Sequence, residues 1–175
     1  MSIYFNGEET DMRRIESADE QLIEKLRSVG VFSRFTEDQI KTFVGQTEVR
    51  KFKAREIIIK EGAHDNLIYF LISGSVILMK ESQLIGVFKR VGDVFGEMRL
   101  VDSAARSASI VADTDTVCLA LEFTPSKTEI EKVHPLIATV LYKTFAEVLA
   151  DRLRKTTDEL SKARKEIEKL KGQSR

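Results

Sequence analysis

Short apolar runs separated by turn residues dominate the middle of the chain, from Thr47 to Glu122. Several runs, such as LIYFLI and VCLAL, are apolar at every position, which is typical of strands that are covered on both faces. Gly62 and Gly74 are among the turn residues between the runs. Many short strands at this spacing predict a β-barrel or a sandwich. We expect strands at 47–53, 56–60, 67–73, 75–81, 84–89, 107–113 and 116–122.

The segment before these strands has the periodicity of helices. Ser17 or Asp19 can cap a first helix that runs through about Val29. The sequence from Thr36 to Gln39 has the form of a capping box, with a hydroxyl at the cap and an amide three residues later. Two short helices are therefore expected ahead of the strands.

The last third of the chain predicts one long helix that begins at about His134-Pro135, where a proline in the first turn is tolerated. Its second half has a heptad repeat, because apolar or small residues recur at alternating steps of four and three. The seam comprises Leu149, Leu153, Thr156, Leu160, Ala163, Ile167 and Leu170.

Charges beside this seam predict how two such helices would pair. In a parallel pair, Glu159 faces Arg164 of the second helix and Glu166 faces Lys171, and both contacts are attractive. Exposed pairs contribute only about 0.2–1 kcal/mol each, so they select the orientation more than they supply stability. We expect a parallel homodimer; the alternative is a helix folded back on its own barrel.

Composition limits the function classes. The chain has 175 residues, 42% of them hydrophobic, and a formal net charge of zero. A dedicated nucleic-acid surface normally needs a basic excess. No apolar stretch approaches the roughly 18 residues that cross a bilayer, and the N-terminus has no secretory signal pattern. We therefore expect a cytoplasmic protein that does not associate with membranes, with its single cysteine, Cys118, as a buried and unreactive thiol.

The stretch from Val94 to Ile110, VFGEMRLVDSAARSASI, has a layout suited to a phosphate. Gly96 allows the backbone to approach a ligand, and the first turn of a helix presents N–H groups to an anion. Arg106 offers a forked and permanently charged donor, while Glu97 can accept hydrogen bonds from sugar hydroxyls. A phosphate site next to a ribose site predicts a nucleotide ligand.

Phe95-Gly96-Glu97 and Arg106-Ser107-Ala108 are nine positions apart. In this order and spacing they resemble the phosphate-binding cassette of the cyclic-nucleotide-binding domains, which occur in the catabolite activator protein, the regulatory subunits of cyclic-AMP-dependent kinase and cyclic-nucleotide-gated channels. The helical segment VFSRFTEDQIKTFV is similar to the lead-in of the same family. The resemblance covers about residues 31–169.

This resemblance implies an α+β fold: an eight-stranded jelly-roll β-barrel, the cyclic-nucleotide-binding β-roll, with N-terminal helices and a long C-terminal coiled-coil helix. The corresponding layout is an N-terminal tail at 1–16, the binding domain at 17–133, a dimerisation helix at 134–171 and a frayed tail at 172–175. The implied ligand is cAMP or cGMP, with no metal.

The resemblance also implies roles for particular residues. The phosphate would bind Arg106, Ser107 and backbone N–H groups near Met98, and the ribose would bind at Gly96 and Glu97. Arg99 stands where the family usually has a small residue, and it brings a second positive charge to the cassette. If it projects to solvent the site is unaffected; if it turns inward it crowds or replaces the ligand. The stretch around Thr156 and Thr157 resembles the part of the activator's central helix that contacts adenine. These two threonines favour cAMP over cGMP, whereas Ser107 is compatible with either.

Each of these residues also has a purely structural interpretation. Arg106 can belong to a surface ion pair, Glu97 can be a carboxylate that favours a helix start, and Ser107 can be an ordinary strand residue. Thr156 can be a tolerated polar position in the seam. The competing function is then an interaction module that keeps the fold but binds no nucleotide.

An enzyme on the same barrel is the third hypothesis. A metal-dependent enzyme needs two or three histidines and a carboxylate around one ion, and His64 and His134 do not form such a pattern. No nucleophile, base and orienting group have a recognisable spacing, so catalysis is not predicted. The charged sequence SKARKEIEKLKGQSR at the end has no helix-turn-helix pattern. We therefore expect no specific DNA binding, and a signal that passes to a protein effector.

Overall fold

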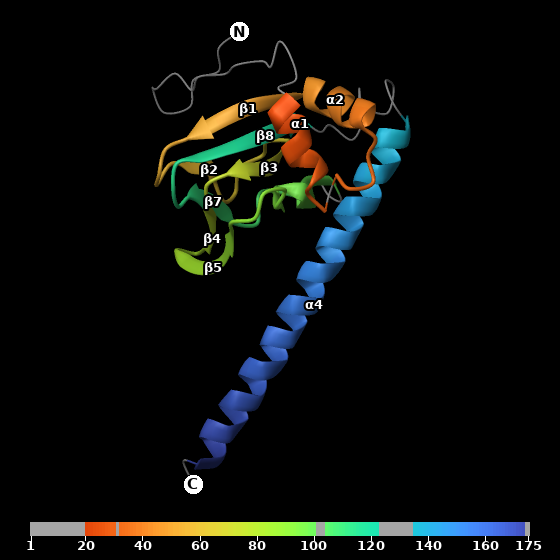
Figure 1. Cartoon of the computed structure of the whole chain (residues 1–175). Helices are drawn as coiled ribbons and strands as arrows, with labels where there is room; N and C mark the ends of the chain where they lie inside the picture. Colours follow the sequence, from red (N-terminus) through yellow and green to blue (C-terminus); the bar gives the residue numbers. More distant parts are fainter. Residues whose placement is uncertain (1–19, 31, 101–103, 123–134, 174–175) are drawn as a thin grey trace. The chain divides into compact units, whose positions relative to one another are not determined.

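The computed structural model of the chain describes residues 20–30, 32–100, 104–122 and 135–173. The chain divides into two compact units between Ala138 and Thr139 (Figure 1). The first unit holds the strands and two short helices, and the second is helical.

Two helices precede the strands, as expected: α1 (Glu20–Arg27) and α2 (Glu37–Gly45). The first ends two residues before the predicted end at Val29, and its predicted caps at positions 17 and 19 lie outside the described residues. The capping box of α2 is confirmed. The Thr36 hydroxyl accepts a hydrogen bond from the Gln39 N–H at 3.3 Å, and the Gln39 side-chain oxygen accepts one from the Thr36 N–H at 2.9 Å.

Eight strands are present in the described residues, and they pair antiparallel in two four-stranded sheets. The first sheet has the order β1 (Thr47–Phe52), β8 (Thr116–Glu122), β3 (Leu67–Ser73) and β6 (Val94–Phe95). The second has the order β2 (Ile57–Ile59), β7 (Ser109–Ala112), β4 (Val76–Lys80) and β5 (Gln83–Phe88).

The seven predicted strands all exist within a few residues of their expected bounds. Only β6 was not predicted, because two residues are too few to display a period of two. Strand pairing joins neither sheet to the other in the described residues, so closure into one barrel stays a prediction.

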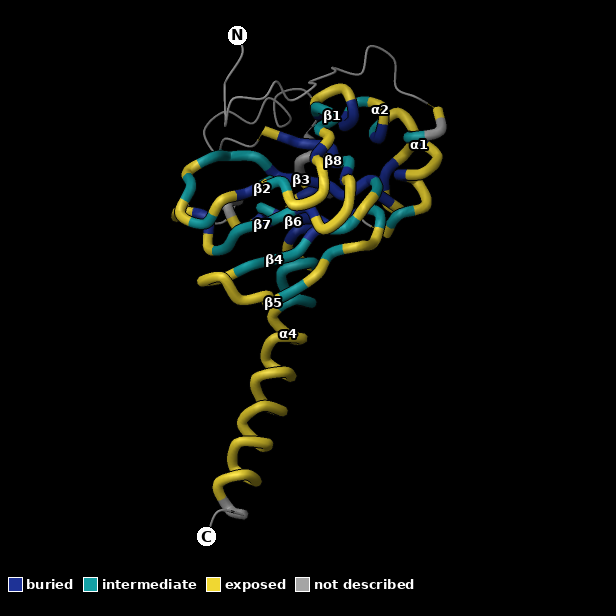
Figure 2. The backbone as a smooth tube through the Cα atoms, turned by 90° about the vertical axis from the view of Figure 1, so that its left-hand side faces the viewer, coloured by how far each residue is buried: buried dark blue, intermediate teal, exposed yellow. Residues whose placement is uncertain are grey.

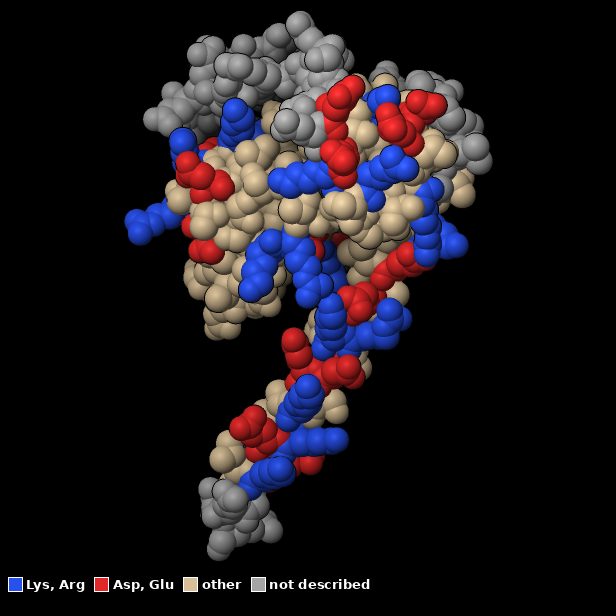
Figure 3. Space-filling model, in the orientation of Figure 1, with Lys and Arg blue, Asp and Glu red and all other residues tan. Residues whose placement is uncertain are grey.

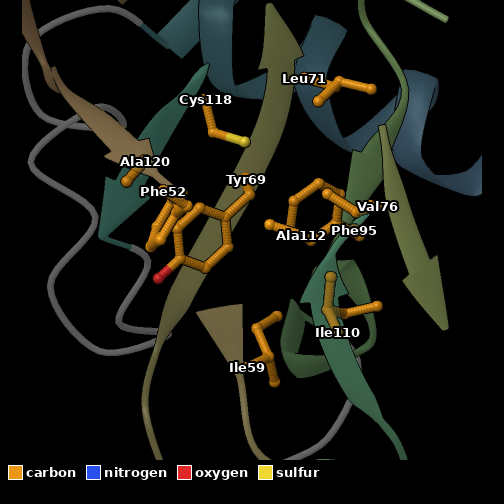
Figure 4. Packing of buried hydrophobic residues seen from close by; sticks show 10 residues of the cluster. All are labelled: Phe52, Ile59, Tyr69, Leu71, Val76, Phe95, Ile110, Ala112, Cys118 and Ala120. Carbon is orange, nitrogen blue, oxygen red and sulfur yellow. The ribbon is translucent and has the colours of Figure 1, made fainter. Parts of the chain in front are cut away.

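The core of the first unit lies between the two sheets (Figure 4). Tyr69 and Leu71 enter it from β3, and Ile110 and Ala112 enter it from β7. Cys118 is buried there too; burial raises the pKa of its thiol to about 12, in agreement with the expected unreactive cysteine.

The opposite face of β3 packs on the helical segment. Phe70 contacts Phe43 of α2 in an edge-on arrangement with ring centroids 5.1 Å apart, and Phe32 lies 5.6 Å from Phe70 and 5.0 Å from Phe43. All three rings are fully buried. The prediction that the run LIYFLI is covered on both faces is therefore confirmed for β3.

The second unit is formed by α4 (Pro135–Gln173) from Thr139 onward. The helix begins at the predicted proline and ends two residues beyond the predicted end. Its residues from 153 to 171 are all exposed (Figure 2). The exposed positions include large apolar side chains of the predicted seam: Leu153, Leu160, Ile167 and Leu170.

Replacing Phe43 with alanine tests the contact between the helices and the sheet. The substitution leaves a cavity beside Phe32 and Phe70, so we expect the free energy of unfolding to fall by about 3–5 kcal/mol in urea denaturation. Lys41→Ala on the exposed side of the same helix is the control and should cost less than about 1 kcal/mol. Equal losses from the two variants would contradict this packing.

Candidate functional site

The turn after β6 brings the backbone of three segments together. Tyr69 of β3 pairs with Phe95 of β6, and the next residue, Gly96, has a positive φ of 82°. A Cβ at this position would lie 2.8 Å from the carbonyl oxygen of Leu67 and 2.9 Å from Nη1 of Arg106. Glycine is therefore required by both conformation and space. The chain continues into η1 (Glu97–Leu100), a single 3₁₀ turn.

Arg106 is central to this region, and only 4% of its side-chain surface is exposed. Its Nη1 donates to the carbonyl oxygen of Gly96 at 2.9 Å, and its Nη2 donates to that of Leu67 at 2.6 Å. Its Nε donates to Oδ2 of Asp65 at 3.1 Å, and its Nη2 also donates to Oδ1 of the same carboxylate. The pair is bidentate, the geometry in which a guanidinium binds a carboxylate most strongly.

Asp65 is a site residue that the sequence analysis missed. It was assigned to the turn before β3, and its Oδ1 does accept a hydrogen bond from the Leu67 N–H at 3.1 Å, as turn aspartates often do. Nothing in its sequence neighbourhood indicated a partner 41 residues away. Partial burial would raise the pKa of its carboxyl, but the hydrogen bonds and charge of Arg106 outweigh burial and hold that pKa below its usual value.

Backbone hydrogen bonds fasten the segment that carries Arg106. The Gly62 N–H donates to the Arg106 carbonyl oxygen and the Arg106 N–H donates to that of Ala63, both at 2.9 Å. The following residue, Ser107, is exposed, and its hydroxyl donates to the sulfur of Met98 in η1 at 3.6 Å. The two ends of the predicted cassette therefore lie next to each other.

The predicted phosphate and ribose positions thus form one cluster within the first unit. Gly96 contacts Arg106 directly, Ser107 contacts Met98, and Glu97 between them is buried with 2% exposed. The side chain of Arg99 lies outside the described residues.

The predicted base contacts are on α4, in the other unit. Thr156 and Thr157 are both exposed, and the hydroxyl of Thr157 donates to the carbonyl oxygen of Leu153 in its own helix at 2.8 Å. Their part in a nucleotide site stays a prediction.

Chemically, the cluster combines a buried guanidinium, an exposed hydroxyl and a buried carboxylate around one glycine turn. These groups can bind an anion and a neighbouring hydroxyl group. Among the described residues, no three histidine, cysteine, aspartate or glutamate side chains come together as metal ligands. None of the described helices is long and apolar enough to cross a membrane.

Comparison with protein families identifies the domain that contains this cluster. The family model described as the cyclic nucleotide-binding domain matches residues 49–125, from β1 to just beyond β8. Residues 49–125 belong to the cyclic nucleotide-binding domain family. The match includes both halves of the cassette and Asp65.

Two curated relatives show how far the similarity extends. Human cGMP-dependent protein kinase 2 is 32% identical over 119 residues, which are 63% of this chain and 16% of the kinase. Glutaminase 2 of Bradyrhizobium diazoefficiens is 30% identical over 151 residues, which are 86% of this chain and 23% of that protein. The chain therefore spans less than a quarter of the length of either relative.

Among solved structures, the catabolite activator protein of Thermus thermophilus is similar with a TM-score of 0.61 and 29% identity. The similarity covers 75% of this chain and 61% of that one. The cyclic nucleotide-binding fold, with antiparallel sheets, N-terminal helices and a C-terminal helix, is thereby established for this chain.

Asp65→Asn tests the buried ion pair in the cyclic nucleotide-binding domain. The Arg106 guanidinium loses its counter-charge, and because 37% of the Asp65 side chain is exposed, water offsets part of the loss. We expect the free energy of unfolding at pH 7, measured by urea denaturation, to fall by about 1–3 kcal/mol.

The pH dependence of this difference has a definite sign. The pKa of Asp65 is lower in the folded than in the unfolded state, so its stabilisation is complete above its ordinary pKa and is lost as pH falls through the folded value. The difference between wild type and Asp65→Asn should be constant from pH 5 to pH 7 and shrink below about pH 4. A difference that grows on acidification would contradict the ion pair.

Proposed function

We propose that this chain is a cytoplasmic cyclic-nucleotide sensor that acts as a parallel homodimer and passes its signal to a protein effector. In this proposal Arg106, Ser107 and the backbone at Met98 bind the cyclic phosphate, while Gly96 and Glu97 bind the ribose. Arg99 adds positive charge beside the phosphate. The catalytic activities named for the relatives are not proposed for this chain, because the match includes less than a quarter of each.

One observation carries the proposal: Arg106 and the glycine turn at Gly96 meet in space although ten positions separate them. One cyclic phosphate can contact both the guanidinium and the backbone of the glycine turn only if the two lie next to each other. The exposed hydroxyl of Ser107 beside Met98 supports the same interpretation. Membership of residues 49–125 in the family adds independent support.

We propose cAMP as the preferred ligand. Thr156 and Thr157 offer hydroxyls that suit the adenine base, one along the predicted seam and one toward the partner. The relative that is a cGMP-dependent kinase is a reason to test both nucleotides side by side.

A second candidate is an interaction module that binds no nucleotide. It is favoured by the state of Arg106, whose guanidinium is occupied by Asp65 and by two backbone carbonyls. To bind Arg106, a phosphate must either share the guanidinium with these acceptors or displace one of them. This alternative predicts the same fold and the same dimer, so only ligand binding distinguishes the two.

Titration calorimetry with cAMP and cGMP tests the proposal. Wild type should bind at one site per chain, and Arg106→Ala should weaken binding by at least about a hundredfold, because a charged and forked donor is lost. Ser107→Ala, an exposed position, should weaken binding by up to about tenfold without a change in thermal stability. This second variant guards against a folding defect in Arg106→Ala.

The result that overturns the sensor is the absence of heat and of thermal stabilisation with either nucleotide at millimolar concentration. Protein unfolded and refolded before the titration excludes a ligand retained from expression. If Arg106→Ala and Ser107→Ala both bind the nucleotide with the affinity of the wild type, the nucleotide binds at another site.

The dimer rests on the exposed apolar seam of α4. Leu153 and Leu170 are 69% and 60% exposed in the single chain, although they occupy the predicted seam. Positive and negative side chains are interspersed along the helix (Figure 3), and the pairs Glu159 with Arg164 and Glu166 with Lys171 complement a parallel copy. We therefore propose a second copy of this helix as the occupant of the seam, in a coiled coil that also includes Leu149, Leu160, Ala163 and Ile167.

Sedimentation equilibrium tests this dimer. Wild type should have a mass of about 40 kDa, twice the 19.9 kDa of one chain. Leu160→Asp should produce monomers at micromolar concentration, because burial of each leucine contributes about 1.5–3 kcal/mol and a buried charge opposes it. Ser161→Asp adds the same charge outside the seam and should remain dimeric. Monomeric wild type would contradict the proposal.

A further inference from the structure

A second cation lies beside the cassette. Lys80, the last residue of β4, donates from Nζ to the carbonyl oxygen of Ser107 at 2.7 Å. Within one residue the carbonyl oxygen, the N–H and the side-chain hydroxyl are only about 3–5 Å apart. The Lys80 ammonium group therefore lies close to the groups of Ser107 that are proposed to face the phosphate.

The charge balance of the site calls for such a cation. Arg106 is the cation of the cassette, but its charge is already neutralised by the carboxylate of Asp65, which binds it in two places. Glu97 contributes no positive charge. A cyclic phosphate adds one negative charge, and its transfer from water is costly unless a positive group approaches it.

Lys80 can leave its carboxylate partner, whereas Arg106 must bind the phosphate while it stays paired with Asp65. Lys80 forms an ion pair with Glu61 at 3.0 Å, but the two side chains are 45% and 34% exposed. Exposed pairs of this kind contribute little, and the flexible lysine stem lets the ammonium group move. The buried pair of Arg106 and Asp65 is held by the surrounding backbone and cannot separate without leaving a buried charge unpaired.

We propose that Lys80 is a ligand-binding cation of this site, which leaves Glu61 and contacts the cyclic phosphate when the nucleotide binds. The inference depends on the proposed nucleotide site and adds to it a residue outside the cassette. The cassette then supplies the cradle with the charges of Arg106 and Arg99, and β4 adds a further positive charge for the phosphate.

A purely structural role for Lys80 makes a different prediction. The Glu61 carboxylate accepts hydrogen bonds from Lys80 and from the Glu81 N–H, the latter at 3.2 Å, so the ion pair also connects two turns. If this connection were the function of Lys80, removal of either partner should weaken binding to the same extent. If Lys80 contacts the phosphate, loss of the Glu61 charge frees it.

The test compares full-length wild type, Lys80→Gln, Lys80→Arg and Glu61→Gln in titrations with cAMP and cGMP at several salt concentrations. Lys80→Gln should raise the dissociation constant about tenfold and reduce its dependence on salt, since one charge contact is lost. Lys80→Arg should restore most of the affinity. Glu61→Gln keeps an acceptor for the Glu81 N–H and should bind at least as tightly as wild type.

Lys53→Gln is the matched control, because Lys53 also forms an exposed ion pair, with Asp115 at 2.9 Å, but beyond the opposite end of β7. It should bind as wild type does. Unchanged affinity and salt dependence in Lys80→Gln would overturn the inference, and so would equal losses in Lys80→Gln and Glu61→Gln. Absence of wild-type binding would instead overturn the nucleotide site itself.

Discussion

The buried guanidinium of Arg106 holds the candidate site together. It joins the turn before β3, the glycine turn after β6 and the segment that leads into β7. A buried cation must be compensated, so these three segments cannot separate without exposing or orphaning a charge. The preorganised shape of the cassette follows from this requirement. It also explains why position 96 has no room for a side chain, since the Leu67 carbonyl and Arg106 occupy that space.

The same interaction constrains how a ligand can act. Arg106 already donates hydrogen bonds to protein acceptors. A phosphate that binds Arg106 therefore gains only the difference in free energy between its own hydrogen bonds and those already present. A switch works on such differences, because a ligand shifts a conformational equilibrium only by its difference in affinity for the two states. Lys80 would give up only an exposed pair with Glu61 on binding a phosphate. The division into a fixed and a movable cation is thus a consequence of burial.

Most apolar residues of β3 are buried, whereas most of those at the heptad positions of α4 are exposed. In the first unit both faces of β3 are covered, by the second sheet on one side and by Phe43 on the other. Along α4, leucines at heptad positions remain exposed in the single chain. A long helix with exposed leucines at this spacing is stabilised by a partner helix more than by its own propensity. Exposed apolar side chains also occur in the first unit, on β5, but only those of α4 have heptad spacing.

Local sequence pattern was sufficient to predict most of the elements. Seven of the eight strands in the described residues followed from residues close to one another in the chain. So did the capping box at Thr36, the start of α4 at Pro135 and the spacing of Gly96 and Arg106. The two-residue strand β6 and the partner of Arg106 did not. Asp65 is a turn residue by every local criterion, and the backbone hydrogen bonds of Gly62 and Ala63 with Arg106 bring it against a guanidinium 41 positions away. Tertiary structure decided this pairing because burial, which depends on the whole fold, turns an ordinary arginine and an ordinary aspartate into an obligatory pair.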